Sequence, residues 1–215
     1  MSAHAYRTTR KPGRSDATRE RIKGAVRELL AEGTFHTSTV EHVADRAGIS
    51  RATLYQHFRS RLELVDAICE TFNANPALLE IRQIVELPDA EAALDKTIAN
   101  CIRFWSSEDA VLRQLYGVAA IDPAAQNLVD RQRADRRSEL ERLTGNLHRT
   151  KRLRDRTTAR TLNLLLVLTS YETFRELREA GQSDRQVTTT LQQTARELLL
   201  RQPQTLASGR ERAPG

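Results

Sequence analysis

Histidine, cysteine and acidic side chains are the groups in this sequence that could do acid–base, nucleophilic or metal chemistry. The five histidines are His4, His36, His42, His57 and His148, and their spacing fits no metal-ligand pattern. The sequence contains no C-x-x-C, no G-x-G-x-x-G, no Walker loop and no G-x-S-x-G. Aspartate and glutamate are plentiful but scattered over charged helix faces. We therefore expect no enzymatic activity, no metal and no cofactor.

The two cysteines, Cys69 and Cys101, are too few for a disulfide framework. Each lies in a helical apolar pattern. This placement favours buried, reduced thiols over a redox sensor.

Hydroxyl side chains stand where helices are expected to begin. Ser38 and Glu41 have the S-x-x-E spacing of a capping box, in which the serine oxygen accepts a backbone N–H and the glutamate reaches back. The same spacing recurs at Ser60 and Glu63, and Ser50 is placed to cap another helix between them. These signals predict three helix starts within about 25 residues.

Apolar residues between these starts follow the spacing of two short helices. In the stretch STVEHVADRAGISRATLYQHF, Val43 and Ala47 share one helix face, and Leu54 and Phe58 share another. Gly48 follows the first helix, where the chain needs a positive φ to turn sharply. The stretch therefore has the pattern of a helix-turn-helix, and an ordinary helical hairpin is the alternative.

The composition indicates an all-α fold. The chain has 215 residues, of which 39% are hydrophobic, 29% charged and only 5% aromatic. Its longest apolar run covers residues 164–168, far short of the roughly 20 residues that span a bilayer. The N-terminus is basic but has no apolar core of the kind found in secretory signals. We expect a cytoplasmic protein that makes no membrane contact.

The positive charge is concentrated at one end of the chain. Residues 1–64 hold 12 Lys and Arg against 7 Asp and Glu, whereas residues 65–215 hold 22 against 21. Nearly all of the net charge of +6 therefore lies on the segment with the helix-turn-helix pattern. This asymmetry is expected of a segment that faces a polyanion.

Four segments are predicted along the chain. They are a flexible basic arm over 1–14, a helix-turn-helix domain over 15–60, a larger helical domain over 61–202 and a disordered tail over 203–215. Ser15 or Asp16 should cap the first helix, and Gly33 should end it. Behind the motif, helices are predicted over 60–72, 76–87, 89–106, 108–121, 123–147, 155–179 and 183–200.

At this point the sequence resembles a known family. Residues 35–64 resemble the DNA-binding domain of the TetR family of bacterial transcriptional regulators. The matching residues are Ser38-Thr39-Val40, Val43-Ala44, Ala47-Gly48-Ile49-Ser50, Thr53-Leu54-Tyr55, His57-Phe58 and Ser60-Arg61-x-Glu63-Leu64. Arg61 stands where the family commonly has lysine, and the spacing from Gly33 to Phe35 is one residue longer than usual. The rest of the chain matches in its helical layout alone.

The resemblance implies that residues 51–57 form a recognition helix that enters the major groove of an operator. Arg51 is the best candidate for a base contact, because its guanidinium fork matches guanine O6 and N7. The expected DNA-contacting residues are Ser38, Thr39 and Ser50 at helix starts, Arg51, Ala52 and Thr53 toward the bases, Gln56 toward either a base or the backbone, and Tyr55, His57 and Arg61 toward phosphates.

The resemblance also implies an effector pocket in the helical domain and a homodimer. Candidate pocket residues are the aromatic residues Phe104, Trp105, Tyr116, Tyr171 and Phe174, with Arg103 and Asn163 as polar partners. The alternative is that the aromatic residues belong to the core. The helices over 162–174 and 187–200 are the expected dimer pair, because each is apolar over more than one face.

The function expected from these observations is a ligand-responsive transcriptional regulator. It would bind a palindromic operator in double-stranded DNA as a homodimer and be released by a small-molecule effector, which makes a repressor the preferred interpretation. A non-regulatory, architectural DNA-binding protein and a transcriptional activator are the alternatives.

Overall fold

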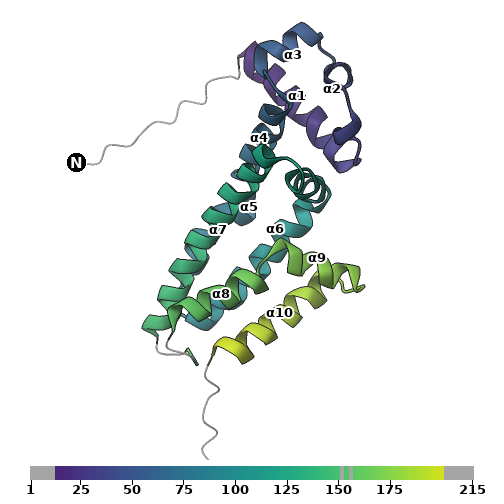
Figure 1. Cartoon of the computed structure of the whole chain (residues 1–215). Coiled ribbons are helices and arrows are strands. Elements are labelled where there is room, and N and C mark those ends of the chain that lie inside the picture. Colours follow the sequence, from purple (N-terminus) through teal and green to yellow (C-terminus); the bar gives the residue numbers. More distant parts are fainter. Residues whose placement is uncertain (1–12, 151–152, 155–156, 201–215) are drawn as a thin grey trace, which may run out of the picture. The chain divides into compact units, whose positions relative to one another are not determined.

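The computed structural model describes residues 13–150, 153–154 and 157–200. Over these residues the chain is almost entirely helical, with one isolated antiparallel bridge between Leu153 and Leu200 (Figure 1). The prediction of an all-α fold is confirmed. The predicted tail and all but the last two residues of the predicted arm lie outside the described residues.

The helices follow one another with short connections. In chain order they are α1 (Arg14–Ala31), the 3₁₀ turn η1 (Phe35–Thr37), α2 (Val40–Arg46), α3 (Arg51–His57), α4 (Arg61–Phe72), α5 (Pro76–Val85), α6 (Ala90–Ala119), α7 (Pro123–Arg149), α8 (Thr158–Leu168), α9 (Tyr171–Glu179) and α10 (Asp184–Leu199).

The chain divides into two compact units, which we call unit 1 and unit 2. Unit 1 comprises Met1–Leu79 and Ser107–Ala134, and unit 2 comprises Glu80–Ser106 and Asp135–Gly215. Helices α5, α6 and α7 therefore contribute residues to both. The boundary predicted between residues 60 and 61 stays a prediction.

The core of unit 1 holds the helix-turn-helix together. Helix α1 packs against α2 and α4, and α2 packs against α3. The buried apolar residues of this part include Ile22, Val26, Leu29, Phe35, Val43, Ala44, Leu54 and Phe58. Val40 and Ile49 are only half-buried. The free energy gained when this apolar surface is removed from water is the main contribution that holds the small helices in place.

The core of unit 2 is formed by the apolar faces of α6, α7, α8 and α10. Its buried residues include Leu94, Ile98, Ile102, Leu140, Leu143, Leu147, Leu165, Val187 and Leu191. Helix α10 packs against α8 and α9. The Nε1–H of Trp105 donates to the Thr169 carbonyl oxygen at 3.0 Å, so this buried indole has its hydrogen bond.

Two predicted helix divisions are wrong. Helix α6 continues through the predicted break at residue 107, because Ser106 and Ser107 are neither glycine nor proline and nothing there stops a helix. The helix predicted over 155–179 breaks instead into α8 and α9. There the Ser170 hydroxyl accepts the Thr173 N–H at 3.0 Å. This hydrogen bond satisfies a backbone donor at the start of α9 and so lowers the free-energy cost of the break.

Helix starts and stops agree with the sequence at most positions. Gly33 and Gly48 have φ values of 74° and 63°, so the two predicted glycine stops are confirmed, and Gly181 has a φ of 86° after α9. The first helix begins earlier than predicted, at Arg14. The carboxylate of Asp16 accepts the Gly13 N–H at 3.1 Å, so Asp16 lies inside the first turn instead of preceding it.

Across the described residues, no helix combines the length and apolar character that a bilayer crossing demands. The same residues contain no group of three or more His, Cys, Asp or Glu side chains suited to holding a metal ion.

Candidate nucleic-acid interface

Helix α2 is capped by Thr39, one residue later than predicted. The Thr39 hydroxyl accepts the His42 N–H at 3.2 Å. Ser38 is instead taken into the end of η1, where its hydroxyl donates to the Thr34 carbonyl oxygen at 2.9 Å. The capping box predicted for Ser38 is therefore wrong. The exposed fraction of Ser38 is 6%, so its side chain is not presented at the surface.

The turn into α3 has the geometry that the sequence predicts. Gly48 lies in the left-handed region, and the Ser50 hydroxyl accepts the Thr53 N–H at 3.1 Å. Arg21 of α1 fixes this turn, because its Nη2 donates to the carbonyl oxygens of Ala47 and Gly48, both at 2.7 Å. Helix α3 is thus positioned by a glycine turn, a serine cap and an arginine from another helix.

Helix α3 has one buried face and one exposed face. Leu54 and Phe58 are each 1% exposed and point inward, as predicted. The remaining side chains of the helix are presented outward to different degrees: Arg51, Ala52, Tyr55 and Gln56 are exposed, while Thr53 and His57 are half-buried. The exposed face therefore contains Arg51, Ala52 and Gln56 of the residues expected to reach the bases, whereas Thr53 is half-buried.

Arg51 is held between two neighbours. Its Nη1 lies 2.5 Å from Oε1 of Glu41 on α2, and its guanidinium carbon lies 5.5 Å from the centre of the Tyr55 ring. A glutamate and an aromatic ring beside it restrict the rotamers of an otherwise exposed side chain.

Arg61, expected at a phosphate, has internal partners. Its Nη1 donates to the Ser38 carbonyl oxygen at 2.7 Å, and its guanidinium lies 4.2 Å from the centre of the Phe35 ring. Burial lowers the pKa of this guanidinium below its ordinary value. Arg19 is used in the same way, because it lies 4.3 Å from the centre of the Phe58 ring and donates to the His57 carbonyl oxygen. Sequence reasoning missed both internal roles.

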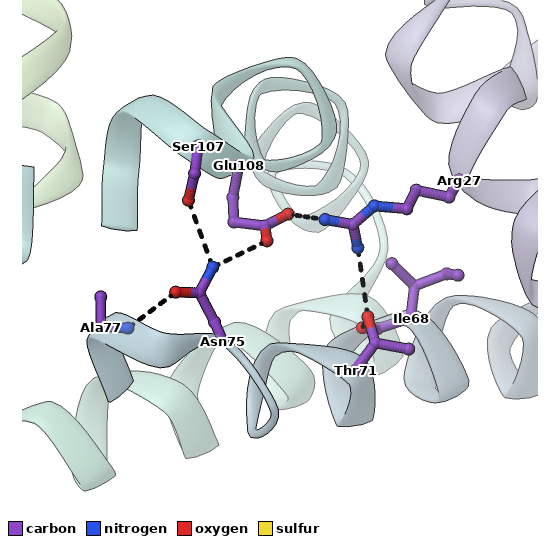
Figure 2. Close-up of polar contacts among 7 residues, drawn as sticks. All are labelled: Arg27, Ile68, Thr71, Asn75, Ala77, Ser107 and Glu108. Atoms are coloured by element: carbon purple, nitrogen blue, oxygen red, sulfur yellow. Dashed lines mark hydrogen bonds and ion pairs between the residues drawn. The ribbon is translucent and has the colours of Figure 1, made fainter. Parts of the chain in front are cut away.

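A buried ion pair joins α1 to the other helices of unit 1 (Figure 2). Arg27 of α1 pairs with Glu108 of α6, whose side chain is only 7% exposed. Arg27 also donates to the Thr71 hydroxyl at 3.2 Å, and Asn75 donates to the second oxygen of Glu108 at 3.0 Å. The Ser107 hydroxyl accepts from the same Asn75 amide at 3.2 Å. The only sequence signal for this network is a glutamate on the apolar face that continues through Val111, Leu112 and Leu115.

The candidate pocket residues do not all lie together. Four of the aromatic residues, all in unit 2, form one cluster: the ring centres of Phe104 and Trp105 are 4.9 Å apart, those of Trp105 and Tyr171 5.6 Å, and those of Tyr171 and Phe174 6.1 Å. All four are at most 7% exposed.

The other three candidates lie outside this cluster. Tyr116 belongs to unit 1, where the Arg133 guanidinium lies 5.4 Å from its ring centre. Arg103 is exposed and is bonded to Glu80 and Asn100, and Asn163 is exposed on α8.

Comparison with known proteins gives a match on the part of the chain that contains the helix-turn-helix. The family model described as bacterial regulatory proteins of the tetR family matches residues 22–68. The chain is also 38% identical over 55 residues to the HTH-type transcriptional activator FasR of Mycolicibacterium smegmatis, and 41% identical over 51 residues to the HTH-type transcriptional regulator UidR of Escherichia coli. These alignments cover 26% and 24% of this chain and 25% and 26% of the relatives, so the chain spans about a quarter of the length of the curated relatives it matches.

Solved structures resemble the chain over most of its length. Salmonella enterica GusR aligns with a TM-score of 0.69 at 21% identity, covering 88% of this chain and 99% of that one. The SmeT–triclosan complex also has a TM-score of 0.69, at 18% identity, covering 91% of this chain and 100% of that one. At such identities the likeness shows the fold alone.

The described residues are almost entirely helical, and a glycine turn positions the capped helix α3 with one face exposed. This arrangement defines a helix-turn-helix protein. Residues 22–68 carry the sequence signature of the TetR family of bacterial transcriptional regulators.

Proposed function

We propose that this protein is a ligand-responsive transcriptional regulator that binds an inverted-repeat operator as a homodimer. The observation that carries the proposal is the exposed face of α3, which lies within the segment matched by the family model. An α-helix fits the major groove of B-DNA, and two-fold related helices read half-sites about 34–36 Å apart. A protein with this partner acts in the cytoplasm.

In this proposal the exposed side chains of α3 read the bases. Arg51 donates to guanine, while Ala52 and Thr53 are small enough to approach a thymine methyl group. Gln56 lies on the same exposed face, and Tyr55 and His57 contact phosphates. The hydroxyls of Thr39 and Ser50 accept backbone N–H groups as caps, and in this proposal both hydroxyls contact phosphate oxygens at the helix starts.

Two residues expected at the interface are assigned other roles. The hydroxyl of Ser38 is buried against Thr34, and the guanidinium of Arg61 is bonded to the Ser38 carbonyl oxygen. Both side chains shape the path of the chain into α2. We therefore leave Ser38 and Arg61 out of the proposed DNA contacts.

The proposed dimer forms through α8 and α10. Val167 of α8 and Leu198 of α10 are 61% and 46% exposed, which is unusual for large apolar side chains on two helices that pack against each other. A second copy would cover them. Two-fold pairing is the commonest oligomeric symmetry and matches the symmetry of an inverted repeat.

The proposed effector is a small apolar or aromatic molecule bound in unit 2. Support comes from the aromatic cluster of Phe104, Trp105, Tyr171 and Phe174, and from two proteins of the same fold whose structures are complexes with triclosan and with choline. Aromatic rings suit both an apolar ring and a quaternary ammonium group. Ligand binding would change the DNA affinity through a differential affinity for two states of the protein.

A repressor is preferred, and an activator is the second candidate because one similar protein, FasR, is named as an activator. An operator that overlaps the promoter would indicate a repressor, whereas an operator upstream of it would indicate an activator.

The effector half of the proposal is tested by a thermal-shift screen of metabolites and antibiotics, followed by DNA-binding titrations with each stabilising compound. We expect at least one compound both to raise the melting temperature and to lower the DNA affinity. If no compound does both, the ligand-responsive part of the proposal is wrong.

A further inference from the structure

A carboxylate lies on the surface that is proposed to meet DNA. Glu41 is in the first turn of α2, and its side chain is 49% exposed beside Arg51, which is 61% exposed. A hydrogen bond from its own backbone N–H and the nearby Arg51 charge hold the pKa of Glu41 below its ordinary value. The group is therefore a fixed negative charge close to a polyanion, and it lowers affinity unless it contributes something else.

The geometry shows what Glu41 does to Arg51. Oε1 of Glu41 is 2.5 Å from Nη1 of Arg51. A guanidinium has five N–H donors in one plane, so it can contact a second planar acceptor pair while one donor is held by Glu41. Guanine O6 and N7 are such a pair. The Tyr55 ring limits the guanidinium from another side, with its centre 5.5 Å from the guanidinium carbon.

From this arrangement we propose that Glu41 is a positioning residue that sets the sequence specificity of Arg51. This inference rests on the proposed DNA-binding function. With the side chain held before DNA arrives, less rotamer entropy is lost when guanine is bound. A wrong base forces Arg51 away from its carboxylate partner, or leaves the carboxylate facing an acceptor. Glu41 therefore sharpens discrimination while lowering affinity for DNA in general.

The test uses the full-length protein and two duplexes. One duplex is the sequence that the wild-type protein enriches from a random DNA library, and the other is a scrambled version of it. The variants are Glu41→Gln, Arg51→Ala and the double variant. Asp45→Asn is the matched control, because it removes an exposed negative charge from the same helix. Circular dichroism and melting temperatures confirm that each variant is folded.

We expect Glu41→Gln to lower the ratio of cognate to scrambled affinity about five- to tenfold, with scrambled binding unchanged or tighter. In the Arg51→Ala background, Glu41→Gln should no longer change that ratio, because the group that it positions is gone. Asp45→Asn should tighten binding to both duplexes alike.

Two results would overturn the inference while leaving the proposed function intact. One is a Glu41→Gln variant that behaves like Asp45→Asn, which would mean that Glu41 only lowers DNA affinity by charge repulsion. The other is a loss of discrimination that persists without Arg51, which would make Glu41 an independent base reader. A wild-type protein that enriches no sequence would overturn the proposed function itself, and this inference with it.

Discussion

The arginines of the helix-turn-helix segment fall into two groups. Arg19, Arg21 and Arg61 donate to main-chain carbonyl oxygens and hold the turn and the helix ends in place. Arg51 instead lies on the exposed face of α3. The net charge of residues 1–64 therefore overstates what the folded surface offers to phosphate, since several of those cations serve the fold.

Replacement of Arg51 and Tyr55 separates base reading from phosphate binding. We expect Arg51→Ala to weaken cognate binding about 5- to 100-fold and to relax specificity. Tyr55→Phe should weaken binding to all sequences alike, because in the proposed complex the hydroxyl that it removes contacts the backbone of the DNA. Fluorescence-anisotropy titrations on cognate and scrambled duplexes measure both. Equal losses for Arg51→Ala on the two duplexes would argue against base readout.

The two cysteines should be poorly reactive thiols. Burial raises the pKa of Cys69 to about 12 and that of Cys101 to about 11. We expect both to react with a disulfide reagent at about pH 8 at least tenfold more slowly in the native protein than in denaturant. Both folded pKa values exceed that of an unfolded cysteine. The protonated thiols therefore make their full contribution to the free energy of unfolding below about pH 9, and this contribution is lost as the pH rises through the folded pKa values. Fast native labelling of either thiol would contradict this.

At the scale of elements, the sequence predicted what depends on neighbouring residues. The caps at Ser50, Ser60 and Ser183 and the glycine stops need only three or four consecutive residues, and the structure has them. The start of α2 was misplaced by one residue, because Ser38 and Thr39 are both hydroxyl residues and only the η1 turn decides between them.

Long-range pairs could not be predicted in the same way. Arg61 bonds to a carbonyl group 23 residues away, and Arg27 to a carboxylate 81 residues away. No local pattern marks such partners, and this explains why Arg61 looked like a phosphate ligand. The aromatic cluster is a similar case: its members were identified by type, whereas their mutual packing and the separate position of Tyr116 depend on the fold.

Gly48→Ala tests the turn before α3. A side chain at φ 63° is strained, and its Cβ would lie 2.9 Å from Arg21 Nη2, in the place where that arginine binds the turn. We expect a loss of about 1–3 kcal/mol in the free energy of unfolding, with weaker DNA binding. Gly24→Ala is the control, because it lies within α1 with nothing within 4 Å of the new Cβ. It should stabilise the protein by about 0.5–1 kcal/mol. Urea unfolding measures both, and equal effects would rule out the strained turn.

Within unit 1, the Arg27–Glu108 pair connects α1 to α6, two helices far apart in the sequence. We expect Glu108→Gln to lower the free energy of unfolding by about 2–4 kcal/mol, since a half-buried guanidinium loses its counter-charge. Combining Arg27→Met with Glu108→Leu should recover much of that loss. Glu80→Gln is the control in an exposed pair, and it should change little. A neutral Glu108→Gln in urea unfolding would mean that the buried pair adds no stability.

We propose that two copies of this chain read an inverted repeat through α3. Enriching random duplex DNA on the full-length protein, and measuring how many chains bind the enriched duplex, tests this. We expect an inverted repeat with half-sites about one helical turn apart, bound by an even number of chains, and loss of the enrichment in Arg51→Ala. Enrichment of no sequence, or of a single half-site bound by one chain, would contradict it.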